Sequence, residues 1–211
     1  MSGRLARRRL LLLLGWLVLH HYPLGCRAGE DAESETRRPY LVPLQVQSCF
    51  PCHGPRGQSG SSAIPSLAGL PRDYLLQVMR AYRHGGRFGT VMGRLAAAYE
   101  EVDLIAMADY FSGQPIKPQK QSTEWRLADL GRRLHRYYCR DCHGGPEESA
   151  KPGVPHLHGR WMDYLRWTLW DYLVGINQGD EEMATQLTAL MRRHGAKGVE
   201  ALLHYYGKGG P

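Results

Sequence analysis

The sequence predicts an all-α protein made of two similar halves. Apolar residues recur near the helical period in several segments, and no long stretch alternates apolar and polar residues as a half-buried strand does. A shift of the chain by 90 residues superposes Cys49 on Cys139 and His53 on His143, and it continues through an Asp-Tyr-Leu segment present in both halves. One unit of about 90 residues has therefore been duplicated.

Composition and charge exclude several classes of protein. With 211 residues, 43% apolar and 22% charged, the chain has an ordinary globular composition, which argues against disorder, collagen and a polytopic membrane protein. The formal charge of +7 suggests nucleic-acid binding at first sight, but five of the 27 basic residues lie in the first 28 positions. The remaining 22 basic and 20 acidic residues nearly balance, so we expect no nucleic-acid partner.

The N-terminal residues 1–28 have the features of a secretory signal peptide. Four arginines precede an apolar run at 10–19, which is too short to cross a bilayer comfortably. Cleavage after Ala28 would release a periplasmic chain that begins at Gly29. Three alternatives stay open: acylation of Cys26 as in a lipoprotein, which would attach the chain to a membrane, a retained anchor helix, and export by the twin-arginine route at 7–9.

Four cysteines remain after the signal peptide, and all belong to two copies of a Cys-x-x-Cys-His motif: Cys49, Cys52 and His53, then Cys139, Cys142 and His143. Two thiols at this spacing can form thioethers to the vinyl groups of one porphyrin, and the histidine that follows can ligate its iron. A pair of redox-active disulfides or half of a zinc site is the weaker alternative. The motifs therefore predict two covalently attached haem c groups.

A methionine in each half is the candidate for the second axial ligand. Met92 lies 39 residues beyond His53 and Met183 lies 40 residues beyond His143, so the two positions keep the repeat to within one residue. A thioether on the far side of the iron raises its reduction potential. The polar segment before Met183 leaves Met191 as an alternative.

The other methionines and histidines are expected to have structural roles. We expect Met79 and Met107 to fill the core at helical spacing, the commoner role of this residue. Six further histidines have no counterpart at the 90-residue offset, so we expect them at the surface or in packing: His84, His135, His156, His158, His194 and His204.

The expected elements follow in chain order. Prolines at 39 and 43 predict a short or irregular helix before Cys49, whereas Ser122 or Thr123 can cap a regular helix at 124–138. Loops rich in Gly, Ser and Pro follow each motif. Further helices are predicted at 71–82, 100–111, 161–174 and 198–206. We expect domains at 29–114 and 122–211, joined by a polar, proline-containing linker at 115–121.

These features give each half a resemblance to a small class I cytochrome c. Across nearly the whole mature chain, the tandem is similar to the two-haem cytochrome subunit of flavocytochrome c sulfide dehydrogenase. The segments that carry this similarity are 90–96, 107–111, 120–122 and 127–143. In this fold family a proline carbonyl orients the axial histidine, a role that falls here on Pro65 and Pro155.

The resemblance implies an electron-transfer subunit without catalytic residues of its own. It would accept electrons from a separate FAD-containing flavoprotein subunit that oxidises sulfide, and pass them to a soluble acceptor. The chain agrees with this division of labour because it holds no Gly-x-Gly-x-x-Gly dinucleotide motif. Two alternatives remain: a free-standing tandem cytochrome between respiratory complexes, and a two-haem enzyme with an open position on one iron.

Overall fold

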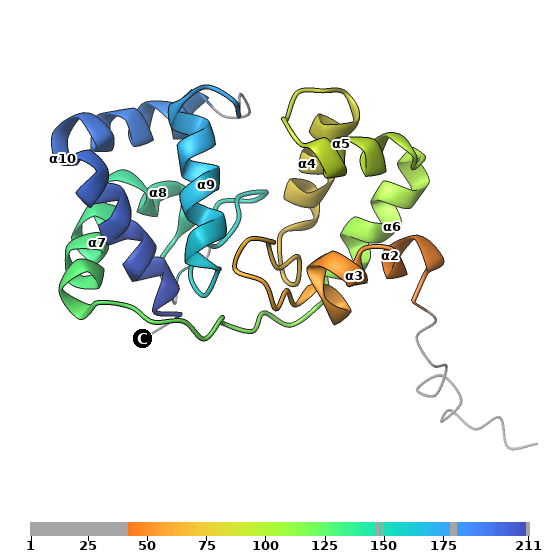
Figure 1. Cartoon of the computed structure of the whole chain (residues 1–211), viewed down its shortest axis with the longest axis horizontal. Coiled ribbons are helices and arrows are strands. Elements are labelled where there is room, and N and C mark those ends of the chain that lie inside the picture. The colour runs from red at the N-terminus through yellow and green to blue at the C-terminus, as the bar shows by residue number, and fades with distance from the viewer. Residues whose placement is uncertain (1–41, 147, 149, 178–180, 210–211) are drawn as a thin grey trace, which may run out of the picture. The chain divides into compact units, whose positions relative to one another are not determined.

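A computed structural model describes residues 42–146, 148, 150–177 and 181–209 (Figure 1). Every regular element in these ranges is a helix, and the extended backbone pairs only in an isolated antiparallel bridge between Arg87 and Asn177. The all-α prediction is therefore confirmed. The predicted signal peptide, Cys26, Ala28 and the start of the first domain lie outside the described residues.

The first half, residues 42–114, consists of short and medium helices: α2 (Leu44–Gln47), α3 (Phe50–His53), the 3₁₀ turn η1 (Pro55–Gly57), α4 (Arg72–Arg83), α5 (Thr90–Ala97) and α6 (Glu101–Ser112). The helix before the first motif has four residues and follows Pro43 directly, as the prolines predicted. Helix α6 begins with a capping box, in which the Glu100 N–H donates to the Asp103 carboxylate at 3.1 Å.

The second half, residues 122–209, contains α7 (Trp125–Tyr138), α8 (Arg140–His143), α9 (Met162–Leu173) and α10 (Glu181–Gly207). Only the last part of α10 was predicted. Two helical segments meet in it at Gly195, whose φ of 61° lies in the left-handed region that glycine tolerates.

The predicted cap of α7 was wrong. Its N-cap residue is Glu124 rather than Ser122 or Thr123, and no side chain of the cap residue bonds the first turn. The Glu124 N–H instead donates to His204 Nδ1 at 2.9 Å. A side chain from α10 therefore satisfies an N–H at the start of α7, a long-range contact that local sequence does not reveal.

The duplication is visible in the backbone. Helices α3 and α8 begin and end 90 residues apart, as do α4 and α9. The turn before α4 and the turn before α9 each contain a glycine with positive φ, Gly69 at 65° and Gly159 at 73°. The two halves therefore share one local fold around the motifs. They diverge after Met92 and Met183, because α10, which holds Met183, is longer than α5, which holds Met92.

Each half has its own hydrophobic core. The first core is formed mainly by α4 and α6, with Leu104 and Phe111 almost completely buried. The second is formed by α7, α9 and α10, with Leu190 and Tyr206 at its centre. A Cβ on Gly131 of α7 would lie 2.0 Å from the Ala201 carbonyl oxygen of α10, so this glycine permits the close approach of the two helices.

The linker at 115–121 lies outside any helix and is hydrogen-bonded to both halves. Gln119 Nε2 donates to Ser66 Oγ at 2.9 Å, and Gln121 Nε2 donates to the Arg160 carbonyl at 2.8 Å. Further bonds join the halves directly, including those from Trp161 Nε1 to the Ser59 carbonyl and from the Tyr164 N–H to the Ser62 carbonyl, both at 3.0 Å. None of the described helices is long and apolar enough to span a membrane.

Two histidines lie in the second core, where packing rather than ligation was expected. His135 Nε2 donates to the Gly144 carbonyl at 2.7 Å, and its Nδ1 accepts from the Tyr206 hydroxyl at 3.0 Å. The His158 ring lies edge-on to the rings of His135, Tyr205 and Tyr206, and neither of its buried nitrogens has a hydrogen-bond partner. Burial lowers the pKa of both imidazoles, and that of His158 to about 4.

The lowered pKa of His158 predicts a loss of stability in mild acid. The unfolded chain binds a proton at its ordinary pKa of 6.5, but the folded chain binds it only near 4, so the stabilising contribution is complete above 6.5 and disappears as the pH falls through this window. The loss approaches about 3 kcal/mol at pH 4. His158→Leu should flatten the decline of unfolding free energy between these pH values, measured by denaturant titration. An unchanged slope in His158→Leu would contradict this account.

Candidate functional site

The two Cys-x-x-Cys-His motifs have the same backbone geometry. In each, the first cysteine is the N-cap of a four-residue helix, α3 or α8, which holds the second cysteine and the histidine. The histidine N–H bonds the carbonyl of the first cysteine at 2.9 Å in both copies, which closes one helical turn. One turn of helix therefore carries two thiols and an imidazole in each half.

Each motif histidine is held by a proline carbonyl. His53 Nδ1 lies 2.8 Å from the Pro65 oxygen, and His143 Nδ1 lies 2.9 Å from the Pro155 oxygen. Because a carbonyl can only accept, Nδ1 carries the proton in both rings. Burial lowers the pKa of His53, so its imidazole is neutral and Nε2 keeps a lone pair. This is the tautomer that can ligate a metal ion through Nε2.

The first thiol of each motif is poorly suited to the alternative chemistries. All four described cysteines are free thiols. Burial raises the pKa of the Cys49 thiol, and raises that of Cys139 to about 11. A redox-active or zinc-binding cysteine requires an accessible thiolate, which a raised pKa disfavours.

A cavity of about 660 Å³ brings the predicted site residues together. Its volume lies in the range of cofactor sites, and its wall is predominantly apolar. All ten residues singled out from the sequence line it: Cys49, Cys52, His53, Pro65, Met92, Cys139, Cys142, His143, Pro155 and Met183. The apolar wall and this donor set of thiols, imidazoles and thioethers fit haem c.

The candidate methionines differ in whether they lie on the cavity wall. Met92 lies on α5 and Met183 near the start of α10, and both are half-buried on the cavity wall. Met191, the alternative to Met183, packs against the second core and is not part of this wall. Met79 and Met107 line the cavity and also pack in the first core, so their predicted filling role agrees with their burial.

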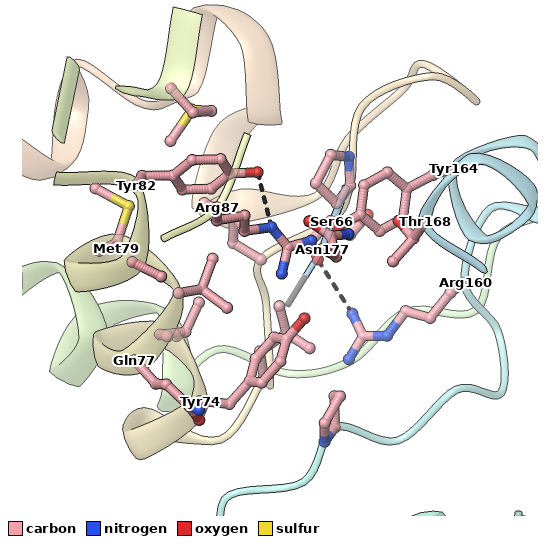
Figure 2. Close-up of a pocket in the computed structure, with 18 of the residues that line it drawn as sticks. Ser66, Tyr74, Gln77, Met79, Tyr82, Arg87, Arg160, Tyr164, Thr168 and Asn177 are labelled. Carbon is pink, nitrogen blue, oxygen red and sulfur yellow. Dashed lines mark hydrogen bonds between the residues drawn. The ribbon is translucent and has the colours of Figure 1, made fainter. Parts of the chain in front are cut away.

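Sequence reasoning missed a group of polar side chains on the cavity wall, which we call the polar cluster: Tyr74, Tyr82, Arg87, Arg160, Tyr164 and Asn177 (Figure 2). Arg87 Nε donates to the Tyr82 hydroxyl at 3.1 Å, and Arg160 reaches the Ser66 carbonyl of the first half. Tyr74 and Tyr164 occupy the same position in the two repeats, and this repetition could have indicated that both belong to the site. Arg160 and Asn177 correspond to Leu70 and Arg87, so the repeat gives no indication of their role.

Comparison with known proteins identifies relatives of the whole tandem. No protein-family model matches the chain. Cytochrome c4 of Azotobacter vinelandii is 28% identical over 216 residues, covering 93% of this chain and 94% of the relative. The solved structure of cytochrome c4 from Pseudomonas stutzeri superposes with a TM-score of 0.67 at 27% identity, covering 77% of this chain and 94% of that one.

Two relatives are named for sulfur oxidation. The thiosulfate dehydrogenase electron acceptor of Thiomonas intermedia is 30% identical over 149 residues, covering 66% of this chain and 69% of the relative. The cytochrome subunit of sulfide dehydrogenase of Chlorobaculum tepidum is 41% identical over 64 residues, which are 30% of this chain and 57% of the relative.

These matches agree with the fold and with the donor set of the cavity. The helical halves are tandem class I cytochrome c domains, the cofactors are two covalently bound haem c groups, and the function is electron transfer. The chain therefore belongs to the dihaem class I cytochromes c.

Proposed function

We propose that this chain is an exported electron carrier in which each half holds one haem c with both axial positions of the iron filled. The observation that carries the proposal is that two complete sets of thiols, imidazole and thioether line one apolar cavity. In this assignment the thioether residues are Cys49, Cys52, Cys139 and Cys142, and the axial ligands are His53, Met92, His143 and Met183.

The residues of each half have distinct tasks. The Pro65 and Pro155 carbonyls hold the imidazoles in the tautomer that leaves Nε2 available. The methionine thioethers would also ligate the iron and would favour its reduced state. Bound haem supplies a one-electron iron couple. An iron ligated by both the imidazole and the thioether of its half would have no position for a substrate, which favours electron transfer over catalysis.

The proposal includes export to the periplasm. It is supported by the signal-peptide features of residues 1–28 and by the use of every remaining cysteine in the two motifs. In the same proposal, cleavage after Ala28 removes Cys26 and leaves a mature chain that begins at Gly29.

The electron donor that we propose is a separate dehydrogenase acting on a reduced sulfur compound. The names of the Thiomonas and Chlorobaculum relatives support this class of partner. The match to cytochrome c4 extends over 93% of the chain, whereas the match to the sulfide dehydrogenase subunit covers 30%. This difference favours a free-standing carrier that meets its dehydrogenase transiently.

A permanent complex with an FAD-containing sulfide dehydrogenase subunit is the second candidate. The 41% identity over 64 residues favours it, because this local identity exceeds the 27–30% of the other relatives described above. In either case a soluble acceptor takes the electrons onward.

The ligand assignment predicts the effect of replacing each methionine. Met92→Ala and Met183→Ala should each convert one of the two haems from six-coordinate low-spin to high-spin, because the iron loses its sulfur ligand. Absorption and electron paramagnetic resonance spectra of the oxidised protein report the change. Met191→Ala is the matched control, and both haems should stay low-spin. A low-spin spectrum in Met183→Ala combined with a high-spin haem in Met191→Ala would contradict the assignment.

The partner proposal is tested by purification and by reduction kinetics. A free-standing carrier should purify from its native host without a flavoprotein, and a catalytic amount of thiosulfate or sulfide dehydrogenase with its substrate should reduce both haems in a stopped-flow experiment. Stoichiometric co-purification of an FAD-containing subunit supports the second candidate instead. Failure of every such dehydrogenase to reduce the protein would contradict both.

A further inference from the structure

Two buried donors in the polar cluster have no hydrogen-bond acceptor. They are Arg160 Nη2 and Asn177 Nδ2, on side chains that are 7% and 6% exposed, and both residues line the cavity. A buried donor without an acceptor is unfavourable, because it has lost its hydrogen bonds to water without replacing them. Both donors come from the second half, and each has replaced a different residue of the first half, Leu70 and Arg87 respectively.

The charge of Arg160 has no counter-charge in the described part of the chain. The acceptors of its other nitrogens are backbone carbonyls: His156 at 3.4 Å, Ser66 at 3.3 Å and Ala68 at 3.2 Å. Arg166, six residues further along, pairs instead with the Asp163 carboxylate at 2.6 Å and the Glu200 carboxylate at 2.8 Å. A buried cation without a partner is unfavourable by several kcal/mol, so the cavity around Arg160 calls for an anion.

The surroundings of Arg160 strengthen this requirement. Arg87 lines the same cavity, donates a hydrogen bond to the Tyr82 hydroxyl, and pairs with Asn177 through the backbone bridge. Figure 2 labels Arg87, Asn177 and Arg160 among the side chains that line this cavity. Among the described residues that line the cavity, the acidic one is Glu182, and it is exposed. This part of the wall is therefore cationic.

The guanidinium of Arg160 lies against the first half of the chain. Although Arg160 belongs to the second half, its guanidinium bonds the carbonyls of Ser66 and Ala68 in the first half. Ser66 directly follows Pro65, whose carbonyl holds His53. The charge therefore lies beside the loop that orients the first histidine.

We infer that Arg160 and Asn177 bind a carboxylate of the porphyrin held by the first half, so that the second half supplies a positive charge to its neighbour's cofactor. The inference rests on the proposed function. Haem carries carboxylates, and a nearby cation stabilises the reduced state of the iron relative to the oxidised state. Because Leu70 occupies the counterpart position, the first half has no equivalent of Arg160 to offer the other haem, and we expect the two reduction potentials to differ.

The test compares Arg160→Gln with Arg166→Gln in the full-length, exported dihaem protein. Intact mass first establishes that two haems are attached, which separates failure of the inference from failure of the proposed function. A spectroelectrochemical titration then resolves the two midpoint potentials. Arg160→Gln should lower one of them and leave the other unchanged, Arg160→Lys should restore it in part, and Arg166→Gln should alter neither.

The affected haem is identified by repeating the titration in a Met183→Ala background, where the second haem is marked by its high-spin spectrum. The shift should appear in the remaining low-spin haem. If Arg160→Gln does not yield folded protein, Asn177→Ala removes the other donor and should lower the same potential by a smaller amount.

A free anion from solution is the other source of such a charge. A phosphate series at constant ionic strength distinguishes the two, because a porphyrin carboxylate gives no phosphate dependence. Potentials that depend on phosphate in the unaltered protein but not in Arg160→Gln would overturn the inference. Unchanged potentials in both Arg160→Gln and Asn177→Ala, with two haems attached, would overturn it as well.

Discussion

The hydrogen bond from each motif imidazole to a proline carbonyl is the constraint on which the rest of the site depends. It fixes the ring and places the proton on Nδ1, which leaves Nε2 as the nitrogen that can bind iron. The preceding turn of helix places two thiols beside that ring. The helices of each half surround this arrangement with a largely apolar cavity wall, on which the methionine also lies.

Duplication produced two such sites, and later divergence made them unequal. The backbone around the motifs is repeated to the residue, as the matching bounds of α4 and α9 show. The two halves differ at positions on the cavity wall. The second half has Arg160 where the first has Leu70, and Asn177 where the first has Arg87. A two-site electron carrier gains direction when its sites differ in potential, and these substitutions are a physical means to that end.

The sequence was most informative where chemistry requires a fixed spacing. Cysteine and histidine spacing predicted the two haem c groups, and the 90-residue offset selected Met92 and Met183, which both lie on the cavity wall. The helices at α4, α6, α7 and α9 followed from apolar periodicity to within about two residues.

What could not be predicted depends on contacts between distant residues. The cap of α7 comes from His204, 80 residues away, and the His135 ring is held by Tyr206 and the Gly144 carbonyl. Arg160 reads as an ordinary surface arginine in the sequence, because its burial arises only when the two halves come together. Sequence-local reasoning sees propensity and spacing, whereas these features are set by tertiary packing.

The most direct test of the whole account is the intact mass of the protein exported from a host that attaches haem c. We expect the mass of the chain beginning at Gly29 plus two porphyrins, and a loss of one porphyrin when Cys49 and Cys52, or Cys139 and Cys142, are changed to alanine. A colourless product, or a purified, folded protein with a single porphyrin, would contradict the account.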